Sequence, residues 1–182
     1  MRLFVGLDLP GGVVQNLESF LAPLQPKVRI QWSPLANLHV TTKFIGEWPE
    51  ERLEVLKAGL AVMPSRQELE VHIRRLGFFP NPHSPRVFFC GIEAAGLAEL
   101  AADTDRATAA LGVEIEKRDY TPHLTLARIR ETTDLQPLRE AIAGQAPPDF
   151  GTFRASEFFL YKSVMRQGGS VYTKLAAFPL TK

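Results

Sequence analysis

The chain has 182 residues and a mass of 20.3 kDa, and its 45% hydrophobic and 23% charged residues are typical of a folded globular protein. Its 21 basic and 20 acidic side chains leave a net charge of +1, which excludes a strongly basic domain that coats nucleic acid. The single cysteine, Cys90, excludes an intramolecular disulfide and a cysteine-rich zinc site. No apolar run approaches the roughly 18 residues of a membrane span, and no secretory leader precedes the first predicted strand. We therefore expect a soluble, cytoplasmic protein.

The first half of the chain alternates predicted strands with predicted helices. A short apolar run over residues 3–7 is followed by turn residues, as expected for a buried strand. Apolar side chains then recur every three or four residues over 13–24, which predicts a helix that ends before Pro26. A run rich in β-branched residues over 38–45 predicts a second strand, and the segment 49–64 predicts a second helix.

The second half of the chain also mixes strands and helices, without a glycine motif for dinucleotide binding. A proline-rich loop is expected over 79–85, and the Gly168-Gly169 pair indicates a turn within a loop over 163–170. The expected strands are 69–74, 86–92, 120–129, 153–161 and 171–178, and the expected helices are 97–111 and 135–142.

An internal repeat is visible at a fixed offset of 84 residues (123 minus 39). At this offset the tripeptide His39–Thr41 falls on His123–Thr125, and residues 3–5 fall on 87–89. The helices that follow these strands coincide as well. We interpret the repeat as two related strand–helix–strand–helix lobes with antiparallel sheets, which close on a shared cleft. The expected class is α+β, in one two-lobed domain over residues 1–182.

Strand alternation places each histidine of the repeat beside a threonine. Residues i and i+2 of a strand share a face, so His39 and Thr41 are expected to point the same way, as are His123 and Thr125. Each face would then offer an imidazole and a hydroxyl to the cleft. The opposite faces are expected to carry Val40, Thr42 and Phe44 in the first strand and Leu124 and Leu126 in the second.

Two histidines across one phosphate can catalyse in-line displacement at phosphorus. With an unperturbed pKa of about 6.5, one neutral imidazole accepts a proton from water and the other donates a proton to the leaving oxygen. Threonine hydroxyls can donate hydrogen bonds to the non-bridging oxygens, and the scheme needs no metal. Two other interpretations stay open: a two-histidine metal site, for which no ligand spacing is present, and two ordinary structural histidines.

The two motifs and their surroundings resemble a known family. The segments Leu38–Gly46 and Thr121–Arg128 are similar to the signature motifs of the two-histidine phosphoesterases. Within that superfamily they resemble the bacterial and archaeal RNA 2′,3′-cyclic phosphodiesterases, also called 2′-5′ RNA ligase-like proteins. The resemblance covers the whole chain. Its further segments are Arg2–Leu7, Phe79-Pro80, Pro85–Val87 and Leu160–Ser163.

The resemblance implies a fold and a role for five residues. The fold would be bilobal with a pseudo-twofold axis, and the motifs would face each other over a positively lined cleft. His39 would be the proton donor to the leaving 3′ oxygen, and His123 would be the proton acceptor for water, which gives an RNA 2′-phosphate end. Thr41 and Thr125 would bind the phosphate, and Arg128 would contact the substrate. No cofactor and no metal are implied.

Two positions of the motifs, Thr42 and Arg128, depart from the family pattern or from simple strand alternation. Strict alternation places Arg128 on the face opposite His123, so its side chain reaches the cleft only if the strand ends or bulges before it. Thr42 stands where the family usually carries a larger apolar residue, which affects local packing.

Several other side chains are candidates for RNA contact. By alternation Lys43 shares the His39 face and could contact phosphate, and Lys162 and Arg166 border the glycine-rich loop and could contact an RNA backbone. Phe44, Phe78, Phe79 and Tyr120 are aromatic residues that could stack a terminal base. His72 is expected on the solvent side of its strand. Cys90 is expected at an apolar position of another strand, where it packs in the core.

We expect hydrolysis of terminal 2′,3′-cyclic phosphates on RNA. The same site could run in reverse and join RNA ends through a 2′-5′ linkage. A non-catalytic RNA-end binder and an enzyme for a small cyclic phosphate of a nucleotide or of ADP-ribose are further alternatives. The expected partner is a single-stranded or tRNA-like RNA end, with no membrane and no obligatory protein partner, and the expected state is a monomer.

Overall fold

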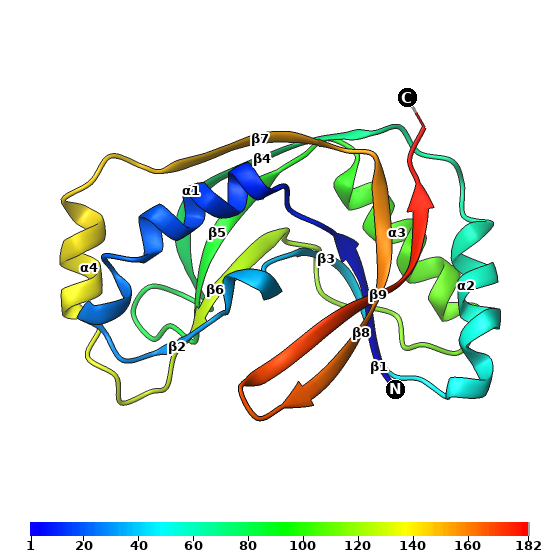
Figure 1. The fold of residues 1–182 in the computed structure, drawn as a ribbon, viewed down its shortest axis with the longest axis horizontal. Helices are drawn as coiled ribbons and strands as arrows, with labels where there is room; N and C mark the ends of the chain where they lie inside the picture. The colour runs from blue at the N-terminus through cyan, green and yellow to red at the C-terminus, as the bar shows by residue number, and fades with distance from the viewer. Residues whose placement is uncertain (182) are drawn as a thin grey trace.

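Two antiparallel sheets and four α-helices form the fold of the computed structural model, which describes residues 1–181 (Figure 1). Sheet A has four strands, in the spatial order β3 (Val40–Glu47), β1 (Arg2–Leu7), β8 (Glu157–Arg166) and β9 (Gly169–Pro179). Sheet B has five, in the order β2 (Gln31–Trp32), β6 (His123–Arg128), β5 (Val87–Glu93), β4 (Leu69–Phe79) and β7 (Asp149–Ala155). This α+β arrangement of two antiparallel sheets confirms the predicted fold class.

The first three helices are shorter than the apolar patterns predicted, and the fourth is shifted by one residue. The predicted helix over 13–24 ends at Leu21, because Pro23 lacks a backbone N–H and cannot continue the α-helix, and the 3₁₀ turn η1 (Gln25–Lys27) follows. In the same way a 3₁₀ turn, η3 (Glu50–Arg52), replaces the first turn of the second predicted helix. The helices are α1 (Gly11–Leu21), α2 (Leu53–Ala61), α3 (Leu97–Ala109) and α4 (Gln136–Ala143).

The repeat at offset 84 relates β1 to β5, α1 to α3, β3 to β6 and α2 to α4. The two halves of the chain are interleaved in the structure, because each sheet also takes a strand from the other half of the chain. β4 follows α2 but pairs with β5 in sheet B, and β8 follows α4 but pairs with β1 in sheet A. The short loop between β4 and β5 explains the first exchange, because closing a hairpin costs little chain entropy.

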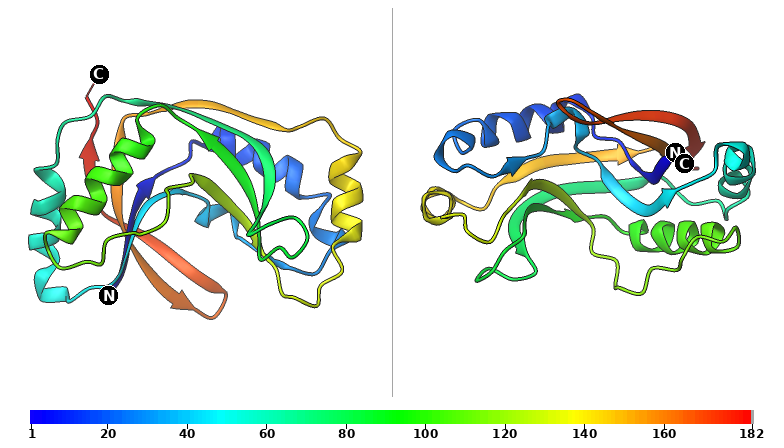
Figure 2. Two further views of the ribbon diagram at one scale, coloured as in Figure 1. Left: turned by 180° about the vertical axis from the view of Figure 1, so that it is seen from behind. Right: turned by 90° about the horizontal axis from the view of Figure 1, so that it is seen from below.

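The helices are exchanged between the sheets as well. In sheet B, α1 packs on β7, where the Asn16 side chain donates to the Phe150 carbonyl at 2.9 Å. In sheet A, α3 packs on β3 and also contacts α2. Figure 2 shows α1 and α3 on opposite sides of the molecule, as a pseudo-twofold relation requires. Each sheet therefore has one face covered by a helix from the other half of the chain.

Two further differences concern the end of the chain. The predicted strand over 153–161 is two strands, because Ser156 interrupts the pairing and the chain passes from β7 in sheet B to β8 in sheet A. The predicted loop over 163–170 is mostly a hairpin, in which Arg166 of β8 pairs with Gly169 of β9. Cys90 is buried among apolar residues as expected, and burial raises the pKa of its thiol to about 12.

Candidate active site

His39 lies directly before β3 and is held by two hydrogen bonds. Its Nδ1 lies 2.7 Å from the backbone oxygen of Asn37, and its Nε2 lies 2.8 Å from the hydroxyl of Thr41. A carbonyl oxygen only accepts hydrogen bonds, so Nδ1 carries a proton and donates it to Asn37. In the neutral imidazole Nε2 is then the free base, and it accepts from Thr41. The pairing of His39 with Thr41 predicted from strand alternation is thus present in the structure.

His123 is held in the same way at the start of β6. Its Nδ1 lies 2.8 Å from the backbone oxygen of Thr121, which assigns the same tautomer and leaves Nε2 free to exchange a proton. Thr121 and Asn37 are themselves 84 residues apart (121 minus 37), so the repeat extends to the group that orients each ring. His123 and Thr125 are both half-buried and reachable from solvent.

Aromatic rings surround His39 more closely than His123. The Phe4 ring centroid lies 4.4 Å from that of His39, and the Tyr172 ring meets His39 edge-on at 5.2 Å. Removal of water by this packing lowers the pKa of His39 below its usual value, while the Asn37 carbonyl and the charge of Asp8 act in the opposite direction. In the free protein the neutral imidazole of His39 is therefore favoured.

His123 packs against the edges of two rings on sheet B. Its ring centroid lies 5.0 Å from that of Phe79 and 5.8 Å from that of Phe89, and those two rings stack on each other at 4.1 Å. Phe79 was a candidate for stacking a base. In the structure its ring instead packs against Phe89 and His123.

A β-bulge at Thr42 changes which side chains of β3 share a face. Thr41 pairs with Gly6 and Lys43 pairs with Val5, so Thr42 is one extra residue on β3. The Thr42 hydroxyl donates to the Val5 carbonyl at 3.1 Å. This buried bond gives Thr42 a structural role at the bulge.

Because of this bulge, two predictions for the first motif are wrong. Lys43 does not share the His39 face: it is buried, and its Nζ lies 2.5 Å from Asp105 of α3 and 2.7 Å from the carbonyl oxygen of Glu114. Phe44 does not lie on the opposite face from His39. It is 66% exposed and packs 6.2 Å from the Phe4 ring, which also contacts His39.

A second bulge, at Leu126, changes which face of β6 carries Arg128. Thr125 pairs with Phe89 and Ala127 with Phe88, so Leu126 is the extra residue of β6, 84 residues after Thr42 (126 minus 42). Both Leu124 and Leu126 are buried, as predicted. After the bulge Arg128 returns to the face of Thr125 and is exposed. The condition for Arg128 to share the face of His123 is therefore met.

The two motif strands are joined by contacts that the sequence does not reveal. Tyr120 was considered as a base-stacking residue, but its hydroxyl donates to the backbone carbonyl of Thr41 at 2.8 Å. Asp105, which binds Lys43, also accepts from the backbone N–H of Glu116 at 3.1 Å. Both contacts join residues that are far apart in the sequence or separated by a turn of the chain, and no local pattern indicates them.

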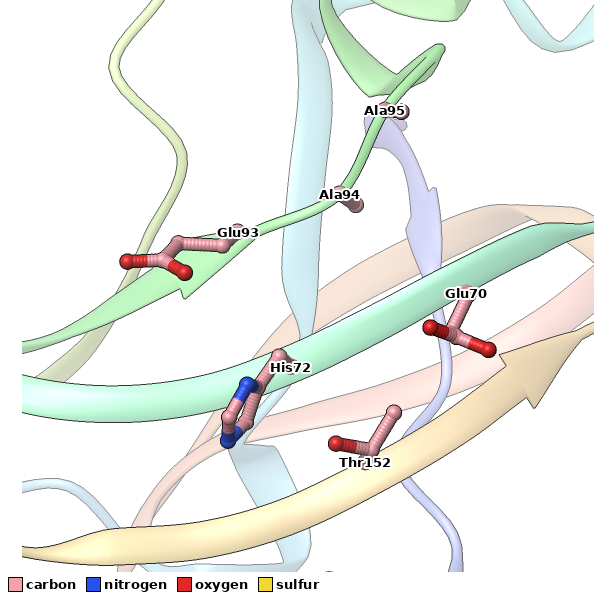
Figure 3. A pocket seen from close by; sticks show the side chains of 6 residues that line it. All are labelled: Glu70, His72, Glu93, Ala94, Ala95 and Thr152. Carbon is pink, nitrogen blue, oxygen red and sulfur yellow. The ribbon is translucent and has the colours of Figure 1, made fainter.

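Other polar residues lie away from the motifs. Ser163 pairs with Tyr172 on the face that meets His39, so alternation places Lys162 and Arg166 on the far face of the β8–β9 hairpin. His72 is half-buried and pairs with Asp149 at 2.7 Å. A hollow of about 290 Å³ beside it is bordered by neither motif (Figure 3). Its lining residues are Glu70, His72, Glu93, Ala94, Ala95 and Thr152.

Among residues 1–181, no three histidine, cysteine or carboxylate side chains are grouped so that they could hold a metal ion. Over the same residues, no helix is long and apolar enough to cross a membrane.

Comparison with known proteins identifies the family. The family model of the 2′-5′ RNA ligase superfamily matches residues 13–165. The chain belongs to this superfamily. The family resemblance carried by the two motifs is thereby confirmed.

Relatives in the superfamily match over nearly the whole chain. An RNA 2′,3′-cyclic phosphodiesterase of Methanocaldococcus jannaschii is 33% identical, over 94% of this chain and 96% of its own length. One of Thermus thermophilus is 34% identical, over 99% and 90%. The crystal structure of E. coli LigT complexed with 3′-AMP superposes with a TM-score of 0.81 at 27% identity, covering 100% of this chain and 98% of LigT. A crystal structure from Thermus thermophilus gives 0.82 at 30% identity, covering 99% and 98%.

Proposed function

We propose that this protein hydrolyses the terminal 2′,3′-cyclic phosphate of RNA to a 2′-phosphomonoester, with His39 as proton donor and His123 as proton acceptor. The observation that carries the proposal is the matched pair of Nδ1–carbonyl bonds, at Asn37 and at Thr121. These bonds orient two imidazoles so that each offers Nε2 for proton transfer. The relatives that match over nearly their full length are RNA 2′,3′-cyclic phosphodiesterases, which supports the same activity.

The reaction needs one water molecule and no other reactant. His123 Nε2 accepts a proton from water as the water oxygen attacks phosphorus. The P–O3′ bond breaks on the opposite side, and His39 Nε2–H donates its proton to O3′, which leaves the phosphate on the 2′ oxygen. In the free protein His39 is favoured as neutral, so it must gain a proton when the anionic substrate binds.

The remaining motif residues stabilise the negative phosphate. The hydroxyls of Thr41 and Thr125 donate to the non-bridging oxygens, and the Thr41 hydroxyl turns from His39 Nε2 to do so. Arg128 supplies a positive charge from the same face as Thr125. Phe44 offers an exposed ring beside the His39 side of the site, which supports stacking of the terminal base there.

We also propose the biological setting of the reaction. The substrate is a single-stranded or tRNA-like RNA end, and residues 1–182 act as one two-lobed domain and as a monomer, without a metal or other cofactor. A location in the reducing cytoplasm agrees with a single, buried cysteine.

The first experiment is a ³¹P NMR time course of a short oligoribonucleotide ending in a 2′,3′-cyclic phosphate, with a chelator present. The wild type is expected to convert the cyclic signal into that of a 2′-monophosphate, and His39→Ala and His123→Ala are expected to lose several orders of magnitude in rate. His83→Ala, which replaces an exposed histidine of a loop, is the matched control. Near-normal turnover by either motif variant would exclude the two-histidine mechanism.

The ligation alternative uses the same site with a different nucleophile: the 5′-hydroxyl of a second RNA, in place of water, attacks phosphorus as the P–O3′ bond breaks. Mixing an RNA with a cyclic-phosphate end and an RNA with a 5′-hydroxyl end measures the competition between the two nucleophiles by the ratio of 2′-5′ joined product to 2′-monophosphate. Predominant joining at equal strand concentrations would reverse the assignment. Binding without either product would instead indicate an RNA-end binder, and turnover of small cyclic nucleotides alone would indicate a small-molecule substrate.

A further inference from the structure

The two motif strands are equivalent position by position, but they differ in charge. At offset 84, Ile45 corresponds to Ile129 and Glu47 to Glu131, and the bulge at Thr42 coincides with the bulge at Leu126, whereas a second bulge of β3, at Ile45, has no counterpart in β6. Two exposed or half-buried positions break the match, since Phe44 corresponds to Arg128 and Gly46 to Arg130. The His39 side of the site therefore presents a ring where the His123 side presents cations.

Arg128 and Arg130 lie on the same side of one extended segment. Ile129 between them is buried, and its N–H donates to the Arg86 carbonyl at 2.8 Å, which continues the pairing past the end of β6. In an extended chain, the Cα atoms of residues two apart are separated by about 6.6 Å, which is the spacing expected for Arg128 and Arg130. Within residues 1–181, neither arginine has a carboxylate within salt-bridge distance, whereas Arg86 is paired with Glu131.

The neighbouring edge of sheet B is polar and basic as well. Gln31 of β2 pairs with Arg128 and is exposed, and Lys27 and Arg29 are exposed in the segment that leads into β2. Figure 1 shows β2 and β6 side by side, with β6 leading away from β3. On the sheet A side of the site, by contrast, the cation Lys174 is bound to Asp8.

We infer that the RNA chain on the 5′ side of the cyclic phosphate leaves the site along the end of β6, where Arg130 binds a backbone phosphate. This inference rests on the proposed function, because that function places the 3′ end of the RNA between His39 and His123. A phosphodiester backbone carries one negative charge per nucleotide, and unpaired arginines match it in charge. The broken symmetry then gives the substrate its direction, with the terminal base toward Phe44 and the backbone toward Arg130.

The test compares Arg130→Gln with wild type on two substrates, a 2′,3′-cyclic mononucleotide and a decaribonucleotide with a cyclic-phosphate end. For the decamer we expect a KM about three- to tenfold higher, with kcat unchanged, and a salt dependence of log(kcat/KM) that is shallower by about 0.7. For the mononucleotide, which has no 5′ backbone, we expect no change. Arg166→Gln is the matched control, because it removes the same charge from the far face of the β8–β9 hairpin.

Three results would overturn the inference: an unchanged KM and salt slope for the decamer, an equal loss on the mononucleotide, or an equal effect of Arg166→Gln. A separate arm measures fluorescence anisotropy of a labelled decamer that already ends in a 2′-phosphate. If wild type opens neither cyclic substrate, the proposed function fails. The binding arm still decides the path of the RNA, with weaker binding by Arg130→Gln alone as the supporting result.

Discussion

The hydroxyl of Tyr120 donates a hydrogen bond of 2.8 Å to the backbone carbonyl of Thr41. Tyr120 lies three residues before His123 in the sequence, and Thr41 lies two residues after His39. A single bond thus joins the segment that leads into the second motif to the strand of the first. Lys43 makes a second connection, since its ammonium group binds both Asp105 and the Glu114 carbonyl. The motif strands β3 and β6 belong to different sheets; the Tyr120 bond holds the segment before β6 against β3, and the Lys43 contacts hold β3 against α3 and the segment after it.

Tyr120→Phe removes only the hydroxyl and leaves the Thr41 carbonyl without this donor. We expect kcat to fall, because the two imidazoles are less well held, and the free energy of unfolding to drop by about 1 kcal/mol. Measurement of kcat, KM and urea unfolding checks both effects. A matched control is Tyr161→Phe, because the buried Tyr161 hydroxyl has no hydrogen-bond partner among residues 1–181 and its loss should not reduce stability. Equal effects of the two substitutions would show that the bond to Thr41 is unimportant.

Lys43→Met should destabilise the fold strongly. The Lys43 side chain is 6% exposed and its partner Asp105 is 19% exposed, so the substitution leaves a largely buried carboxylate without its cation. The expected loss is about 3–5 kcal/mol in the free energy of unfolding, measured by denaturant titration. Lys57→Met is the control, because Lys57 pairs with Glu54 at the surface and should contribute little. Equal free energies of unfolding for Lys43→Met and Lys57→Met would show that the buried pair contributes no more to stability than the surface pair.

Much of this fold could be predicted from the sequence, because both copies of the repeat show the local residue patterns that are typical of strands and helices. The strands before and at each His-x-Thr, and the helices between them, follow from alternation, from apolar periodicity and from the 84-residue offset. The exchange of β4 and β8 between sheets was not predictable, because an antiparallel edge accepts either strand and only the tertiary packing selects the partner.

The bulges explain which site residues could be predicted. Burial of Val40, Leu124 and Leu126 followed from simple alternation, since these residues are buried whether or not a bulge follows. Lys43 and Phe44 lie after the bulge at Thr42, where alternation changes phase, and both were placed on the wrong face. No residue type signals a bulge of this kind, because the extra residue is defined by its pairing with β1.

The lowered pKa of His39 predicts how stability depends on pH. Burial disfavours the charged imidazole in the folded protein, so the unfolded chain binds its proton first as the pH falls. The contribution of the neutral His39 side chain to the free energy of unfolding is therefore fully present above about pH 6.5. This contribution is lost progressively as the pH falls from there toward the lower pKa of His39 in the folded protein. His39→Gln should lose less stability between pH 7 and pH 5 than wild type. Parallel stability profiles for the two proteins would contradict this prediction.

Gly77 gives a test of how the packing around His123 affects the reaction. A Cβ added at Gly77 would lie 2.3 Å from the tip of the Phe89 ring, which must then move. Phe89 stacks on Phe79 and both rings meet the edge of His123, so the imidazole loses part of its support. We expect Gly77→Ala to reduce kcat clearly while the protein stays folded, because the tip of one side chain can shift at modest cost. Gly12→Ala is the control, since its added Cβ meets nothing within 4 Å and a helical alanine should stabilise slightly. Normal kcat in Gly77→Ala would show that the Phe89 ring does not position His123.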